Sequence, residues 1–322
     1  MKILIIGGTG TISYDVTMHL AKNKKNFLTL VNRKLKKKKI YKNIKIIKLN
    51  YHNLKQKLTL LDNNYDIVIN FIAYKKKHAQ FDYELFKNRT KLYIFISTAS
   101  VYRNNKKIIN EESKADENRW IYQREKIRCE KYLLQKFKKN KFPVLIIRPG
   151  HIYSQNILPV SLWSYGIDLV INLIKTGNAY IFENNNSWSI MHSKDFAINF
   201  VNLIKNKNKC LGQIINIGSK KITNWKKIYK TYQKILSLKK INFKIIKNKK
   251  ITILPNKIKK QIITDRNKFY VFNINKIKLI TGTFVEKTSL KKGLEKSLKY
   301  NWQIIKKNNL NQKLINNLDK AT

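Results

Sequence analysis

The stretch that decides the fold is Ile3-Leu4-Ile5-Ile6-Gly7-Gly8-Thr9-Gly10-Thr11-Ile12-Ser13, near the start of the chain. Four consecutive apolar residues indicate a short buried strand, and a helical pattern follows the glycines through Leu20. In a strand, glycine turn and helix of this kind, small residues let the backbone approach a pyrophosphate, and the helix N-terminus supplies free N–H groups. Ser13 occupies the third position of the usual glycine fingerprint, so the strict form is not met. The stretch nevertheless predicts a dinucleotide-binding loop.

Further strands and helices alternate along the first half of the chain. We expect strands at residues 27–31, 44–47, 66–71, 93–97 and 144–147, with helices around residues 81–89 and 122–137. Strands that alternate with helices build βαβ units and a parallel sheet. The predicted fold class is therefore α/β, with a Rossmann-type doubly wound parallel sheet and a smaller C-terminal substrate lobe.

The pattern loosens after Pro149. We expect a helix at residues 162–175, a strand at 180–182, a helix at 195–205 and a strand at 214–217. Residues 239–260 alternate Lys with Ile and contain Pro255, which predicts irregular strands of the smaller lobe. The expected domains are an NAD(P)-binding Rossmann domain (1–150), a substrate lobe interleaved with the last Rossmann elements (151–302) and a Lys/Asn-rich tail that frays (303–322).

The composition combines an ample apolar fraction with an unusual charge. The 322 residues are 43% hydrophobic and carry a formal net charge of +50. Eight of the 68 basic residues are Arg and the rest are Lys. Because Lys has A/T-rich codons, the excess of Lys fits an A/T-biased genome, and it also fits a surface that binds polyanions. No run approaches the ~18 apolar residues of a membrane helix. A strand that starts at residue 3 leaves no room for a targeting peptide, so we expect a cytoplasmic protein.

Cysteine usage gives no sign of a metal or a disulfide framework. Cys129 and Cys210 are the two cysteines, and they form no metal-ligand spacing. We therefore expect no metal site.

Tyr122 and Lys126 form the strongest catalytic candidate. Residues four apart on a helix project from the same face, and an ammonium beside a phenol would lower the phenol pKa from its reference near ~10. A tyrosine tuned in this way can act as a general acid or base. In a chain with 17 Tyr and many Lys, the alternative is a solvated helix face that carries this spacing by chance.

Hydroxyl and polar residues follow three of the predicted strands. Thr98 and Ser97 end the strand at 93–97, where a hydroxyl faces the ligand crevice of a parallel sheet or else bonds to the strand-end backbone. Arg33 ends the second strand, with Lys34 next to it and no carboxylate for a ribose, which favours NADP over NAD. Asn50 follows the third strand, where it would hydrogen-bond an adenine or simply form a turn.

The order and spacing of four motifs resemble the extended short-chain dehydrogenase/reductase family, in its nucleotide-sugar epimerase/dehydratase group. The motifs lie at residues 7–10, 96–102, 122–126 and 147–153, and further matches to the atypical branch lie at 187–188, 192–197, 216–225, 272–273 and 293. The resemblance implies that Tyr122 is the acid/base, that Lys126 holds the nicotinamide ribose, and that Thr98, or alternatively Ser97, binds the reacting oxygen. It also implies cofactor contacts at Gly7, Thr9, Gly10, Thr11, Ile12, Arg33, Asn50, Lys126, Arg148 and Pro149.

The family resemblance leaves two functions open. The first is an NAD(P)-dependent oxidoreductase or epimerase acting on a hydroxyl or carbonyl substrate such as a nucleotide sugar. Dehydratases follow the central Thr with Asp-Glu, whereas Ala99 and Ser100 stand here, so we do not expect a dehydratase. The alternative is an RNA-binding protein, because the atypical branch includes chloroplast stem-loop RNA-binding proteins.

Two further expectations concern the assembly of the protein and its histidines. Relatives pair through the helix at 122–137, which predicts a homodimer by analogy. His151 and His192 recur in the atypical branch and would either contact the substrate or form structural hydrogen bonds.

Overall fold

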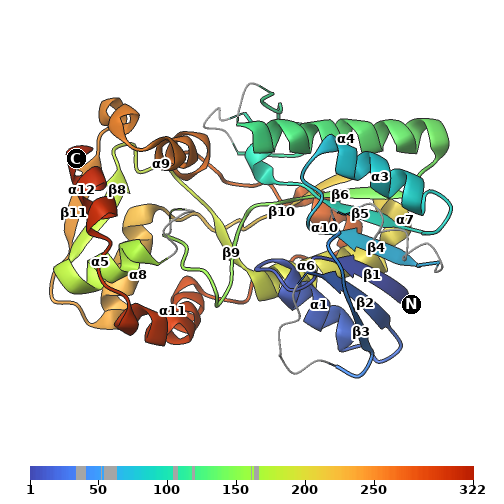
Figure 1. Ribbon diagram of the computed structural model, residues 1–322, viewed down its shortest axis with the longest axis horizontal. Coiled ribbons are helices and arrows are strands. Elements are labelled where there is room, and N and C mark those ends of the chain that lie inside the picture. The colour runs from blue at the N-terminus through green and yellow to red at the C-terminus, as the bar shows by residue number, and fades with distance from the viewer. Residues whose placement is uncertain are drawn as a thin grey trace.

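The computed structural model describes residues 1–33, 41–51, 53, 64–103, 108–117, 120–160, 162 and 167–322. Its centre is a seven-stranded sheet (Figure 1) in the order β10-β6-β5-β4-β1-β2-β3, and every neighbouring pair is parallel. The strands are β1 (Lys2–Ile6), β2 (Phe27–Asn32), β3 (Ile44–Lys48), β4 (Ile67–Asn70), β5 (Tyr93–Ile96), β6 (Val144–Pro149) and β10 (Ile214–Ile217). The predicted Rossmann-type sheet is confirmed.

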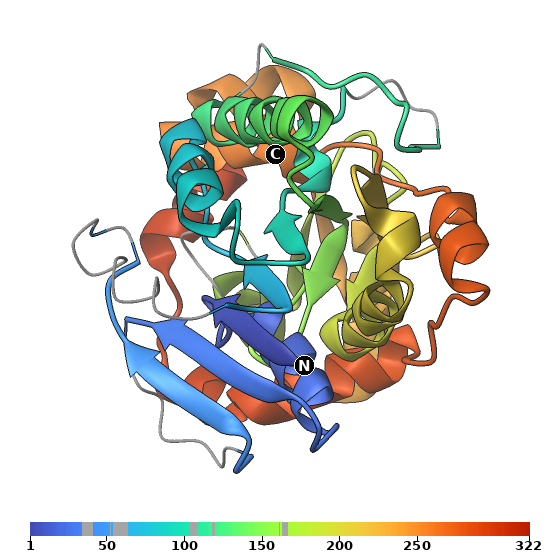
Figure 2. The same ribbon diagram turned by 90° about the vertical axis from the view of Figure 1, so that its right-hand side faces the viewer.

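Helices cover both faces of this sheet because its strands are apolar on both sides. One face carries α3 (Lys76–Phe86) and α4 (Ile121–Asn140), and the other carries α1 (Ser13–Ala21), α6 (Ser193–Lys205) and α10 (Asn275–Thr281). In Figure 2 the green α4 and cyan α3 lie on one side of the sheet and the olive α6 lies on the other. Ile3 and Ile5 pack with the second group, whereas Leu4 and Ile6 pack with the first.

The strand order reverses between β1 and β4, which lie side by side at the centre of the sheet. Ligands of doubly wound sheets bind in the crevice outside the carboxyl ends of the strands at this reversal. The glycine bend after β1 and the segments after β4 and β5 therefore meet at one edge of the sheet.

A second lobe, with its own apolar core, lies at the left of Figure 1. It contains α5 (Asp168–Thr176), β8 (Asn178–Phe182), α8 (Trp225–Leu236), β11 (Asn242–Ile246), α9 (Asn256–Gln261), α11 (Leu290–Lys307) and α12 (Gln312–Lys320). A short parallel pair, β7 (His151–Tyr153) with β9 (Ile190–His192), lies between the lobe and the sheet. The chain then returns to the sheet through α6, α7 (Lys207–Cys210) and β10. The domain limits themselves stay a prediction.

Two sequence expectations about this lobe were wrong. Residues 239–260 contain one strand, β11, which pairs in parallel with β8, followed by a 3₁₀ turn at Asn248–Ile253 and α9. The end of the chain does not fray, because α12 buries Leu314, Ile315 and Leu318 against the lobe. These apolar positions recur at helical spacing within a Lys/Asn-rich background, and the composition hid them.

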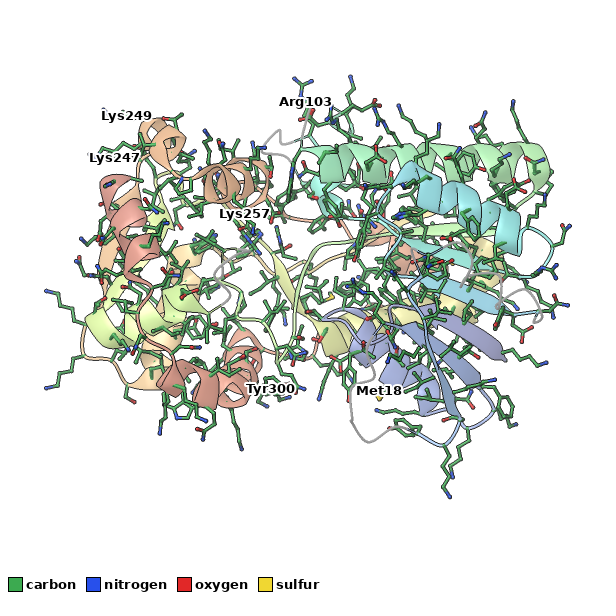
Figure 3. The ribbon with its side chains drawn as sticks, in the orientation of Figure 1. Met18, Arg103, Lys247, Lys249, Lys257 and Tyr300 are labelled. Carbon is green, nitrogen blue, oxygen red and sulfur yellow. The ribbon has the colours of Figure 1, made fainter. Side chains whose placement is uncertain are left out.

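The excess of lysine is spread over the molecule. Side chains tipped with nitrogen project from both halves in Figure 3, where Lys247 and Lys249 are labelled at the outer end of the second lobe. Both interpretations of the +50 charge therefore stay predictions.

No helix in the described part of the chain is long and apolar enough to cross a membrane. In the same residues, no group of three or more His, Cys, Asp or Glu side chains could hold a metal ion. Cys129 and Cys210 are both buried and free.

Candidate active site

The glycine bend is closed by hydrogen bonds from a single serine. Gly7 has a φ of 80°, and its N–H donates to the Val31 carbonyl at 2.9 Å. Ser13 Oγ donates to the Gly7 carbonyl at 2.6 Å and accepts from the Gly10 N–H at 2.8 Å. The residue that departs from the glycine fingerprint therefore links Gly7 to Gly10 across the bend.

The polar residues expected to hold the adenosine end of a cofactor lie along the same edge. Thr9 Oγ1 donates to Asn32 Oδ1 at 3.3 Å, which ties the bend to the end of β2. Arg33 is exposed immediately after β2, and Asn50 is exposed after the neighbouring β3. Lys34 lies outside the described residues. The cofactor contacts of Arg33 and Asn50 stay predictions.

Thr98 rather than Ser97 faces the crevice. Thr98 starts the 3₁₀ turn Ala99–Val101, where its Oγ1 accepts from the Ser100 N–H at 3.2 Å and lies 2.9 Å from Ser100 Oγ. Ser97 is 4% exposed, and its Oγ is buried without a hydrogen-bond partner among the described residues. The sequence allowed either hydroxyl to bind the reacting oxygen of the substrate, and the geometry favours Thr98.

Tyr122 comes to Thr98 from the first turn of α4. The two side chains line the same cavity, and Thr98 is near enough to influence the pKa of Tyr122. The Tyr122 ring centroid lies 6.2 Å from that of Tyr74 and 6.1 Å from that of Trp120, so aromatic rings flank the phenol. The structure thus brings together the two hydroxyls that the sequence singled out 24 residues apart.

Lys126 lies beneath this pair in a different role from the expected one. It is 1% exposed, and its Nζ donates to the carbonyl oxygens of Ala73 at 2.8 Å and Ile96 at 2.6 Å. Its Nζ is 5.9 Å from the Tyr122 ring centroid. Lys126 therefore ties α4 to the ends of β4 and β5.

The expected depression of the Tyr122 pKa by Lys126 was wrong for this structure. Burial raises the pKa of Tyr122, and nearby Tyr74 and Asp265 raise it further, while the nearby Thr98 side chain lowers it in part. Burial also lowers the pKa of Lys126, to about 8. Desolvation therefore outweighs the attraction that the four-residue spacing suggested.

The burial of Lys126 should make the free energy of unfolding depend on pH, and this dependence can be tested. Its folded pKa of about 8 lies below the unfolded value, so between the two the unfolded chain binds a proton that the folded protein does not. The contribution of Lys126 to stability therefore rises as pH rises through this window. Compared with Lys126→Met, the wild type should gain about 2–3 kcal/mol in free energy of unfolding between pH 7 and pH 10.

Urea unfolding of both proteins at the two pH values measures this difference, because all other titrating groups are common to both. A difference that stays constant with pH would show that Lys126 has an ordinary pKa.

Arg148 is engaged away from the crevice. Its Nε and Nη2 donate to the two carboxylate oxygens of Glu130 at 3.0 and 2.6 Å, and its guanidinium carbon lies 4.7 Å from the Tyr102 ring centroid. This buried bidentate pair joins β6 to α4. Its contacts do not favour the cofactor role predicted for Arg148, whereas Pro149 lines the cavity described next.

A cavity of about 200 Å³ opens beside Thr98 and Tyr122. Part of its wall comes from the second lobe, where a π-helical turn at Ile262–Arg266 contributes Thr264, Asp265 and Arg266. The sequence analysis missed these residues. They lie some 140 positions after Tyr122, and a single π turn leaves no periodic signal.

His151 and His192, the two histidines noted in the sequence, have different environments in the structure. His151 lines the cavity, and burial lowers its pKa to about 4, so its imidazole is neutral at neutral pH. His192 is 3% exposed, and its Nδ1 accepts from the Lys194 N–H at 3.2 Å to cap α6. His151 therefore belongs to the candidate site, and His192 has a structural role.

A parallel sheet of this order, with a glycine bend at its reversal and a Tyr–Thr pair beside it, defines a Rossmann-type protein of the short-chain dehydrogenase/reductase kind. The chain belongs to the NAD dependent epimerase/dehydratase family, whose profile matches residues 3–218. No match was found among curated proteins.

Solved structures of the same fold cover nearly the whole chain. UDP-glucuronic acid 4-epimerase from Bacillus cereus, in complex with UDP-glucuronic acid and NAD, is 19% identical, with a TM-score of 0.75 over 94% of this chain and 100% of that one. The dTDP-glucose 4,6-dehydratase of Bacillus anthracis, in complex with NAD, is 16% identical (TM-score 0.75, 94% and 97%). The UDP-Glc/GlcNAc 4-epimerase of Campylobacter jejuni is 15% identical (TM-score 0.74, 94% and 99%). At these identities the likeness establishes the fold.

Proposed function

We propose that this protein is an NAD-dependent epimerase that acts on a hydroxyl-bearing carbon of a nucleotide sugar, with Tyr122 as the acid/base. The observation that carries the proposal is that Tyr122 and Thr98 line one cavity at the sheet edge where the strand order reverses, the edge that also carries the glycine bend. Family membership supports the cofactor, and the two epimerase structures of the same fold support the reaction class.

The residues at the bend fit a dinucleotide. Among the described residues, the single atom within 4 Å of a Cβ built on Gly10 is Ser13 Oγ, so the backbone there stands open to a close approach. The bend leads directly into α1, whose N-terminus attracts a pyrophosphate. Gly7, Gly10, Thr11 and Ile12 would hold the cofactor there. When bound, NAD supplies a reversible hydride acceptor.

The protein's own groups handle the proton. To oxidise the substrate carbon, Tyr122 Oη must take the proton of the substrate hydroxyl, and to reduce the resulting carbonyl it must return that proton. Thr98 Oγ1, which lines the same cavity as Tyr122, would bind the same substrate oxygen. Because burial raises the pKa of Tyr122, the free protein holds the proton on the phenol at neutral pH, and the base form becomes more populated as pH rises.

Epimerisation is favoured over dehydration at this site. The positions after Thr98 carry Ala99 and Ser100, so no carboxylate stands in that turn to remove a proton from a neighbouring carbon. A dehydratase shares the fold, so the distinction depends on these two side chains and not on the architecture.

Direct assay tests the proposal. Purified protein is denatured and its released nucleotide identified, and NAD-loaded protein is then incubated with UDP- and dTDP-linked hexoses while NMR follows the sugar configuration. We expect interconversion of two epimers without net formation of NADH. Loss of water from the sugar, or no change in any sugar by protein that holds NAD, would contradict the proposal.

Arg33 should decide the preference between cofactors. If its guanidinium pairs with a 2′-phosphate, Arg33→Ala should weaken NADPH binding by about 10-fold or more and leave NADH binding within about 2-fold. Arg103→Ala is the matched control, because Arg103 is also exposed and projects from another part of the surface (Figure 3). Fluorescence titration measures both affinities, and equal losses for the two cofactors would remove the phosphate role.

The RNA-binding alternative receives no support from the family match or from the structures named above. The homodimer also stays a prediction. It would form through α4, whose outer surface carries the exposed cations Arg124 and Arg128.

A further inference from the structure

Polar residues of the second lobe line the same cavity as Tyr122, and the proposed reaction does not use them. Asp265 is the carboxylate among them, and the cavity places it with Thr98 and Tyr122 around one space of about 200 Å³. The Asp265 charge contributes to the raised pKa of Tyr122, which agrees with this closeness.

A local break in helix geometry presents this carboxylate. Residues Ile262–Arg266 form a single π turn directly after α9, closed by the Asn267 N–H on the Ile262 carbonyl at 2.9 Å. π turns of this kind occur frequently at functional sites. The turn places Thr264, Asp265 and Arg266 along the cavity together with Gln261 of α9.

The contacts of Asp265 leave its oxygens able to accept hydrogen bonds. Its Oδ1 lies 3.5 Å from His151 Nε2, and its Oδ2 lies 3.5 Å from Arg266 Nε. Both distances are longer than a normal charge-assisted hydrogen bond. The Asp265 side chain keeps 23% of its surface exposed, although it lies in a largely buried wall.

The neighbours of Asp265 flank its carboxylate without covering it. His151 is neutral at neutral pH because burial lowers its pKa. The guanidinium carbon of Arg266 lies 5.5 Å from the Trp188 ring centroid, so the arginine rests on an aromatic surface beside the carboxylate. The wall therefore offers strong acceptors to a ligand that carries donors.

We propose that Asp265 determines substrate specificity by accepting a hydrogen bond from a ring hydroxyl of the sugar other than the hydroxyl handled by Tyr122 and Thr98. An ionised carboxylate only accepts, and a sugar hydroxyl donates, so the two are complementary. The inference rests on the proposed function, because it places a nucleotide sugar in this cavity.

Binding measurements on an inactive background test the inference. NAD-loaded Tyr122→Phe protein is titrated with UDP-glucose and dTDP-glucose and with their 2-, 3- and 6-deoxy analogues, and the same series is repeated with Tyr122→Phe/Asp265→Ala. At one ring position we expect removal of the hydroxyl to weaken binding by about 10- to 100-fold when Asp265 is present, as for a hydrogen bond to a charged group. In the double variant the same removal should cost no more than about 2-fold.

Two further variants keep the result interpretable. Tyr122→Phe/Glu84→Gln removes a negative charge from the exposed end of α3 and should leave every deoxy penalty unchanged. If Asp265→Ala does not fold, Asp265→Asn keeps the shape and a neutral acceptor, and it should reduce the penalty to several-fold.

The outcomes separate the two proposals. Tight binding of the parent sugars with the same deoxy penalties with and without Asp265 would overturn the role of Asp265 and leave the proposed function standing. Failure of every nucleotide sugar to bind the NAD-loaded protein would overturn the proposed substrate class and, with it, the inference.

Discussion

Replacing Tyr122 with phenylalanine should lower turnover by about 10²- to 10⁴-fold, the usual contribution of a positioned general acid or base. The change removes one oxygen from a side chain that lines the cavity together with Thr98. NAD binding and thermal stability should stay close to wild type, because the ring keeps its contacts with Tyr74 and Trp120. Single-turnover kinetics and NAD titration measure the two effects separately.

The pH dependence gives this prediction a second readout. With the pKa of Tyr122 raised by burial, the phenolate fraction is small at neutral pH, so wild-type oxidation of the substrate should speed up as pH rises from 7 to 9. The residual rate of Tyr122→Phe should lack this rise. Tyr132→Phe is the matched control on the same helix, because Tyr132 lies nearly three turns further along α4 and outside the cavity. Normal turnover by Tyr122→Phe would exclude Tyr122 as the acid/base.

The sheet was predictable because its signals are local. Continuous apolar runs such as that of β1, separated by turns and helical patterns, fixed both the strands and their parallel arrangement. The second lobe was less predictable, since β11 pairs with a strand some 64 residues earlier and the Lys/Ile alternation continues beyond it into a 3₁₀ turn. Tertiary packing, and not alternation, decides where that strand ends.

The candidate site also has a part that the sequence predicts and a part that it does not. Tyr122 and Thr98 lie in segments whose roles follow from the sheet, and the structure places both along one cavity. The effect of Lys126 could not be inferred from spacing, because the sign of a pKa shift depends on how much water each group loses on folding. Asp265 could not be found at all, because its position depends on how the second lobe packs over the sheet edge.

Gly10→Ala should weaken NAD binding by about 10- to 100-fold while leaving the fold intact, since overpacking a close contact costs about 1–3 kcal/mol. A Cβ built on Gly10 lies 3.2 Å from Ser13 Oγ, and no other described atom lies within 4 Å, so the protein itself tolerates the methyl group with a small shift. The contact that requires glycine here is therefore the expected pyrophosphate. Isothermal titration with NAD, beside urea unfolding, separates affinity from stability.

Two other glycines show why position 10 is the informative one. A Cβ on Gly7, where φ is 80°, would lie 2.6 Å from Ile72 Cγ2, so Gly7→Ala should destabilise the fold itself and would confuse folding with binding. At Gly282, φ is 71° and no described atom lies within 4 Å of the built Cβ, so Gly282→Ala should cost backbone strain alone and leave NAD affinity unchanged. If Gly10→Ala bound NAD as tightly as wild type, the cofactor could not pass over this bend, and Gly7, Thr11 and Ile12 would lose their proposed roles with it.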